Sequence, residues 1–132
     1  MKRAAKIFKS APDGKKHIAV DKENFDEILL FLQDNNLIRK FDLICSIILS
    51  GIKNTELYDK EAINSKCKNV TAMKFKSKQN TRIYCQEVKQ NDKSLVIITS
   101  ELLPKKKNQK NKEKEINLIK KVASYEYRIE DK

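Results

Sequence analysis

The stretch NVTAMKFKSKQNTRIYCQEVKQNDKSLVIITSEL, residues 69–102, decides the fold, because its apolar side chains largely recur with a period of two. That period is typical of β-strands, whose successive side chains point to opposite faces. Turn-forming residues interrupt it at 77–80 and at 91–92. Because these turns are short, we expect an antiparallel three-stranded meander. Its strands are predicted near residues 70–77, 81–89 and 94–101.

The faces of these strands differ in polarity. In the first strand Thr71, Met73 and Phe75 share one face, and most residues of the other face are lysines. In the second strand Ile83 and Cys85 alternate with Arg82, Tyr84 and Gln86. Residues 95–98 of the third strand are apolar without interruption, which is typical of a strand covered on both sides.

Upstream of the meander, the apolar spacing becomes that of helices. A first helix with one apolar face is predicted after Asp21. A second helix is predicted from Leu37 to Ile52, and Gly51 lies where a C-cap residue is expected. The short link between them favours an antiparallel helical hairpin. We expect the following residues to be buried: Ile28, Leu29, Leu32, Phe41, Ile44, Ile48, Ile83, Val96 and Ile98.

The remaining segments complete the predicted order. A first strand is expected at 3–9, a short extended piece at 17–20, a helical turn within 53–68 and a final helix from about Asn111. The resulting order is β-α-α-β-β-β-α. It predicts an α+β fold in which a helical hairpin packs on an antiparallel sheet and a C-terminal helix follows. Residues 1–132 are expected to form a single domain, because no repeat or linker interrupts them.

Charge is the strongest feature of the composition. The 132 residues include 29 Lys and Arg against 18 Asp and Glu, for a net charge of +11. A field of that sign attracts polyanions such as nucleic acid, an anionic membrane face or an acidic protein. The alternative is a surface filled with lysine for compositional reasons, since lysine far outnumbers arginine.

Other sequence features narrow the class of protein. Cys45, Cys67 and Cys85 are odd in number and widely spaced, and His17 is the only histidine. Free thiols are therefore expected, with no metal site and no cysteine nucleophile. No apolar run is long enough to span a bilayer, and no signal-peptide core follows the basic N-terminus. We expect a cytoplasmic protein that does not contact membranes.

Two motifs resemble the RelE/ParE toxin superfamily, in particular its phage-derived HigB-like branch. TRIY at 81–84 is similar to the Tyr-Arg-Ile segment of that branch, and KKNQKNKEKEI at 106–116 aligns without a gap with Lys-Lys-Thr-Gln-Lys-Thr-Pro-x-x-Glu-Ile. The threonines are replaced by Asn108 and Asn111, and the proline by Lys112. The first meander strand lacks the usual Glu-Leu-Arg. Motifs cover roughly residues 65–120, and element order extends the resemblance to the rest.

The resemblance implies an mRNA endoribonuclease of a type II toxin–antitoxin pair, held inactive by an acidic antitoxin and associated with the ribosome. Such enzymes cleave without a metal or a small-molecule cofactor: the ribose 2′-hydroxyl attacks the adjacent phosphorus. The protein must then orient the phosphate, stabilise negative charge and move protons. Two alternatives stay open, a non-enzymatic nucleic-acid or ribosome-binding protein on the same fold and a ParE-type topoisomerase inhibitor.

Candidate catalytic residues are Arg82, Tyr84 and Lys106. A guanidinium can grip a phosphate through two bonds, although Arg82 could instead pair with Glu87 or Glu101. Tyr84 shares the face of Arg82 and could stack on a base or supply a proton. Tyr125 and Tyr127 are expected to pack at the end of the last helix.

Lysines are densest between the third meander strand and the last helix. Lysines placed before a helix N-terminus can form a phosphate-binding corner with its free N–H groups. A solvated charged loop is the alternative. The candidate phosphate- and RNA-binding residues, beside Lys106, are Lys105, Lys107 and Lys110.

Overall fold

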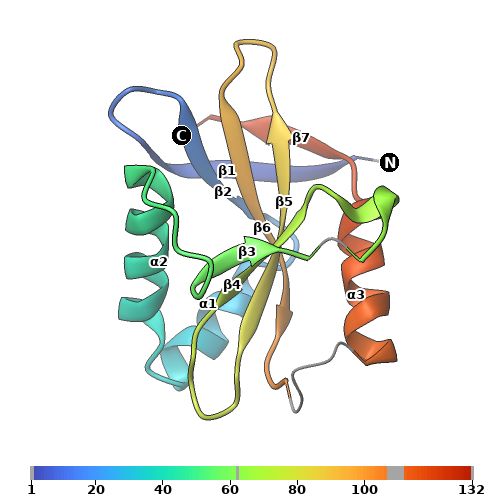
Figure 1. Cartoon of the computed structure of the whole chain (residues 1–132). Helices are drawn as coiled ribbons and strands as arrows, with labels where there is room; N and C mark the ends of the chain where they lie inside the picture. The colour runs from blue at the N-terminus through green and yellow to red at the C-terminus, as the bar shows by residue number, and fades with distance from the viewer. Residues whose placement is uncertain (1, 62, 107–111, 132) are drawn as a thin grey trace.

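The structure, a computed structural model, describes residues 2–61, 63–106 and 112–131. In chain order its elements are β1 (Arg3–Ser10), β2 (Lys16–Asp21), α1 (Phe25–Asp34), α2 (Ile38–Ser50), β3 (Tyr58–Lys60), the 3-10 turn η1 (Ser65–Cys67), β4 (Val70–Lys74), β5 (Arg82–Lys89), β6 (Leu95–Leu103), α3 (Glu113–Ser124) and β7 (Tyr127–Glu130). This is a mixed α+β fold (Figure 1).

Within the described residues, seven strands form one sheet in the order β3-β4-β5-β6-β2-β1-β7. The predicted meander is confirmed, because β4 pairs with β5 and β5 with β6, both antiparallel. The sheet as a whole is mixed, which corrects the expectation of a purely antiparallel sheet. β2 runs parallel to β6, and β1 runs parallel to β7. Both parallel pairs join segments far apart in the chain, and local periodicity carries no signal for them.

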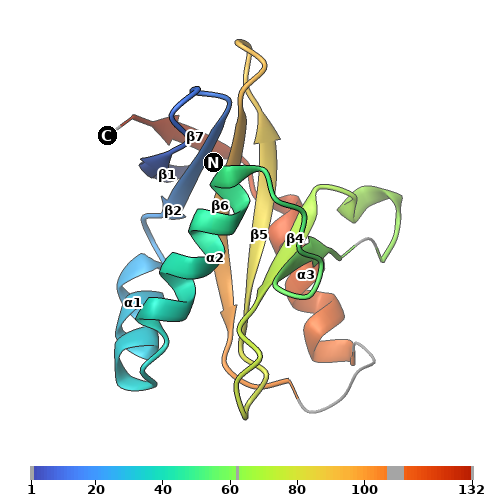
Figure 2. The ribbon, with the colours of Figure 1, turned by 60° about the vertical axis from the view of Figure 1, so that its left-hand side comes forward.

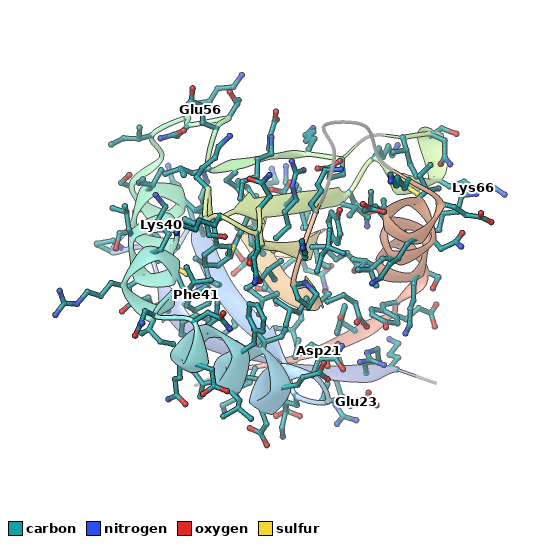
Figure 3. The ribbon with its side chains drawn as sticks, turned by 90° about the horizontal axis from the view of Figure 1, so that it is seen from below. Asp21, Glu23, Lys40, Phe41, Glu56 and Lys66 are labelled. Atoms are coloured by element: carbon teal, nitrogen blue, oxygen red, sulfur yellow. The ribbon has the colours of Figure 1, made fainter. Side chains whose placement is uncertain are left out.

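Helices cover both faces of the sheet (Figures 2 and 3). α1 and α2 pack on one face, where Ile28, Leu32, Phe41, Ile44 and Ile48 meet Met73, Phe75, Ile83, Cys85 and Ile97. α3 packs on the opposite face, where Ile119 and Val122 meet Tyr84, Val70 and Leu103. Strand alternation explains this division, since Ile83 and Tyr84 are neighbours that point to opposite faces. Eight of the nine residues expected in the core are buried, and Leu29 is half-buried.

Helix α1 begins at Phe25, with Asn24 as its N-cap, after Asp21 ends β2. One predicted element needs correction. The segment expected to be a helical turn instead contributes β3, which pairs with β4 at the sheet edge, and η1. Gly51 is confirmed as the C-cap of α2, with a left-handed φ of 79°. The expected start of the last helix, Asn111, lies outside the described residues.

Cys45, Cys67 and Cys85 are free and buried, as predicted. Burial raises the pKa of the Cys45 thiol to about 12, so this thiol stays protonated and unreactive at neutral pH. None of the helices in the described part of the chain combines the length and apolar character needed to cross a bilayer.

Candidate nucleic-acid interface

The β4–β5 hairpin loop and the chain that leaves β6 lie together at one end of the molecule, the lower end in Figure 1. Three hydrogen bonds tie them: the Lys106 N–H donates to Gln79 O (2.9 Å), Thr81 Oγ1 donates to Pro104 O (2.8 Å), and Asn80 Nδ2 donates to Lys106 O (3.5 Å). The segment at 104–106 is therefore held against the hairpin loop. This contact brings Lys105 and Lys106 beside the hairpin loop that carries Lys76 and Lys78.

We use the name basic hairpin end for Lys74, Lys76, Lys78 and Lys105. Lys76, Lys78 and Lys105 are exposed, and Lys74 is half-buried, with its ammonium donating to Thr55 O (3.3 Å). Among residues 2–61, 63–106 and 112–131, none of the four belongs to an ion pair. Their charge is therefore available to a polyanion.

Two hollows open at this end. Lys74, Lys76 and Arg82 line a small one of about 20 Å³, because Lys74 and Arg82 are cross-strand partners in the β4–β5 pair. A larger cavity of about 280 Å³ separates the hairpin loop from the α1–α2 turn and is lined by Asn35, Leu37, Ser77, Lys78, Gln79 and Thr81. Three lysines of the basic hairpin end thus line these hollows, Lys74 and Lys76 the smaller and Lys78 the larger, and Lys105 lines neither.

Lys76 adopts a left-handed backbone conformation, with φ of 54°, as does Asn80 with φ of 52°. Asparagine tolerates this region, whereas lysine rarely adopts it and pays a cost in backbone strain. The loop is fixed by Phe75, which is buried in the core, and by the Asn80 N–H bond to Ser77 O (3.0 Å). Strain of this kind is often retained where an exposed residue has a function.

Arg82 forms an ion pair with neither Glu87 nor Glu101. Its Nη1 donates to Oε1 of Glu61 at 2.7 Å, and the two side chains are only 17% and 11% exposed. Glu61 follows β3, and its N–H donates to Val70 O (2.9 Å), which fixes it beside β4. A carboxylate therefore engages one nitrogen of the guanidinium and offsets its charge.

Lys106 is buried rather than presented to solvent, with 3% of its surface exposed. Burial, together with the positive charge of Arg82, lowers its pKa, while Glu115 and Glu61 act in the opposite direction. Glu115, in the first turn of α3, is also buried. Arg82 and Lys106 are close enough to interact electrostatically, and the two carboxylates balance their charge.

Tyr84 is fully buried under α3 and packs with Ile119 and Val122. Its hydroxyl has no hydrogen-bond partner in the described part of the chain. Burial is the main cause that raises its pKa, so Tyr84 is a neutral core residue. In this structure it presents no ring to a base, which corrects the prediction drawn from strand alternation alone. Lys107 and Lys110 lie outside the described residues.

A second polar cluster, which sequence reasoning missed, joins the chain ends to the sheet. Asp21 is fully buried and accepts from Arg3 Nε (2.7 Å), from the Tyr127 hydroxyl (2.7 Å) and from the Glu23 N–H (2.8 Å). The Arg3 guanidinium lies 4.1 Å from the ring centre of Tyr125, whose hydroxyl donates to Glu101. Figure 3 labels Asp21 and Glu23 where β2 leads into α1.

Among the described residues, none of the buried side-chain polar atoms of this cluster lacks a hydrogen-bond partner, which is typical of a structural cluster. Tyr125 and Tyr127 therefore pack near the end of α3, as expected. In sequence the cluster was hidden, because 106 residues separate Asp21 from Tyr127 and the pairing of β1 with both β2 and β7 brings them together.

Over the described residues, no group of three or more His, Cys, Asp or Glu side chains is arranged to hold a metal ion. No family model matches the chain, and no curated protein or solved structure matches it either.

Proposed function

We propose that the chain binds RNA at the basic hairpin end and acts as an mRNA endoribonuclease of the RelE/ParE toxin type. The observation that carries this proposal is the convergence of Lys74 and Lys76 with Arg82 on one hollow, beside the exposed Lys78 and Lys105. Lysine and arginine side chains around a concave surface are the usual means of holding a phosphate backbone.

The order of elements supports the toxin-like fold. The helical hairpin α1–α2 comes between β2 and the meander β4–β6, and α3 follows the lysine-rich stretch, as in the order that the resemblance implies. The described sheet has three strands more than that order: β3 extends one edge, and β1 and β7 extend the other beyond β2.

In the proposed reaction the 2′-oxygen of a ribose forms a bond to the adjacent phosphorus, and the bond from phosphorus to the 5′-oxygen breaks. The products are a 2′,3′-cyclic phosphate and a 5′-hydroxyl, so one proton leaves the 2′-hydroxyl and one is delivered to the 5′-oxygen. Arg82 would stabilise the phosphorane charge, and the lysines would hold the flanking phosphates. The charge of the basic hairpin end also suits an acidic antitoxin as the inhibitory partner.

A second candidate function is RNA or ribosome binding without cleavage. It is favoured by the burial of Tyr84 and Lys106 and by the pairing of Arg82 with Glu61. In this conformation none of the three is free to exchange a proton with a substrate. Both candidates share the binding surface and differ only in chemistry.

The test is induced expression in a bacterium, with growth followed together with primer extension on translated mRNA. Cleavage at discrete positions that is lost in Arg82→Ala supports the endoribonuclease. Binding of single-stranded RNA by the purified protein, with intact mRNA in the cell, supports the second candidate. Absence of both binding and cleavage would contradict the two together.

A further inference from the structure

A cleft distinct from the basic hairpin end lies between the C-terminal turn of α2, the loop after it and the sheet. Its volume is about 450 Å³, within the range of small-molecule sites. The apolar part of the wall is formed by Ile47, Ile48, Leu95 and Ile97, of which Ile48 and Ile97 are buried. It offers a surface for one medium-sized apolar side chain.

Two carboxylates line this cleft, Asp59 and Glu87, and a side-chain hydrogen bond fixes Glu87 in place. Oε2 of Glu87, on β5, accepts from the Tyr58 hydroxyl at 2.6 Å, and that hydroxyl accepts from Thr71 Oγ1 at 2.7 Å. Burial raises the pKa of Tyr58, which therefore remains a neutral donor. A carboxylate has about four lone-pair sites, so a single accepted bond leaves Glu87 capacity for a further donor.

Lysines supply the opposite charge. Lys16, Lys53 and Lys60 line the same cleft, and in the described part of the chain none of them is in an ion pair. Lys53 and Lys60 are exposed, and Lys16 is half-buried. The cleft thus combines an apolar wall, the two carboxylates of Glu87 and Asp59, and three lysines that join no ion pair among the described residues.

We propose that this cleft binds a free α-amino acid with an apolar side chain. The ammonium group of the ligand would bond to Glu87, its carboxylate would pair with the lysines, and its side chain would pack on the isoleucines and Leu95. The carboxylate of a simple fatty acid would be repelled by Glu87, and the ammonium of a simple amine would be repelled by the lysines. Only a compact zwitterion satisfies both charge groups.

The experiment is calorimetric titration of the full chain with L-leucine and L-phenylalanine, then with glycine and with the N-acetyl and amide derivatives of whichever binds. We expect one of the two amino acids to bind, and glycine and both derivatives to bind at least about tenfold more weakly, a difference of 1.4 kcal/mol. Absence of binding by both amino acids would overturn the proposal. An N-acetyl or amide derivative that binds as tightly as its parent would also overturn it.

The variant Glu87→Gln keeps the shape of the side chain and removes its charge, so we expect at least a tenfold loss of affinity. Glu56→Gln is the matched control, because Glu56 is exposed near the same loop and does not line the cleft. Circular dichroism and thermal unfolding establish that each variant is folded. Equal affinity of Glu87→Gln and the parent would contradict the assigned contact.

Discussion

Nη1 of Arg82 lies 2.7 Å from Oε1 of Glu61, although 21 residues separate the two along the chain. The pair links β5 to the segment after β3 at the inner side of the basic hairpin end. Under the proposed function, RNA and this internal carboxylate would compete for one guanidinium.

Glu61→Gln should therefore strengthen RNA binding. The amide keeps a hydrogen bond to Arg82 but no longer neutralises it, so the guanidinium is freer to take a phosphate. We expect a several-fold lower Kd for single-stranded RNA, measured by fluorescence anisotropy. Glu56→Gln, an exposed carboxylate away from Arg82, should leave Kd unchanged. A weaker affinity for Glu61→Gln would show that the pair organises the site rather than blocking it.

Arg82→Ala should reduce mRNA cleavage by about a hundred- to a thousand-fold, the usual effect of losing one charge-stabilising donor. Arg39→Ala, which removes an exposed arginine on α2, is the matched control. The measurement is the single-turnover cleavage rate with both proteins shown to be folded. An Arg82→Ala protein as active as Arg39→Ala would exclude Arg82 from the reaction.

Lys76→Gly separates stability from binding. Glycine removes the backbone strain of the left-handed conformation at φ of 54°, which raises the free energy of unfolding by about 1 kcal/mol. Its greater freedom in the unfolded chain lowers the free energy of unfolding by about 1 kcal/mol, so we expect little net change. Loss of the lysine should nevertheless weaken RNA binding. Urea unfolding and anisotropy together test this. Lys66→Gly, which removes an exposed lysine in η1, provides the comparison for loss of charge elsewhere.

Lys106 makes stability depend on pH. Its folded pKa is lowered below the ordinary 10.5, so the unfolded chain binds more protons between these two values. The free energy of unfolding of the parent, minus that of Lys106→Met, should therefore rise as pH increases from the lowered pKa of Lys106 to 10.5. Urea unfolding at a series of alkaline pH values measures the difference. A difference that stays constant or falls with pH would contradict the lowered pKa.

Asp21→Ala should lower the free energy of unfolding by about 3 kcal/mol, because it leaves Arg3, the Tyr127 hydroxyl and backbone N–H groups without their acceptor. Glu23→Ala is the control, since Glu23 is 61% exposed and lies 3.5 Å from Arg3. It should change stability by no more than about 0.5 kcal/mol. Equal effects of the two substitutions would show that the buried cluster does not secure the chain ends.

The sequence was most informative where structure is local. The meander, the two successive helices α1 and α2 and the cap at Gly51 follow from periodicity and turn residues, and all were found. The parallel pairing of β2 with β6 and of β1 with β7 was not predictable, because each partner lies on a distant segment. Tyr84 also shows what local sequence cannot predict. Strand alternation correctly places Tyr84 on the same face of β5 as Arg82, but the burial of Tyr84 depends on the packing of α3 against that face. Glu61 was missed because nothing local marks it as the partner of Arg82.

The most direct test of the central claim is the salt dependence of RNA binding. Kd for a single-stranded RNA would be measured from low to physiological salt for the parent and for a triple variant, Lys76→Gln, Lys78→Gln and Lys105→Gln. Each lysine that contacts a phosphate contributes about 0.7 to the slope of log K against log salt. We predict that the triple variant binds more weakly at low salt and that its slope is shallower by about 2. An unchanged Kd and slope would contradict RNA binding at the basic hairpin end.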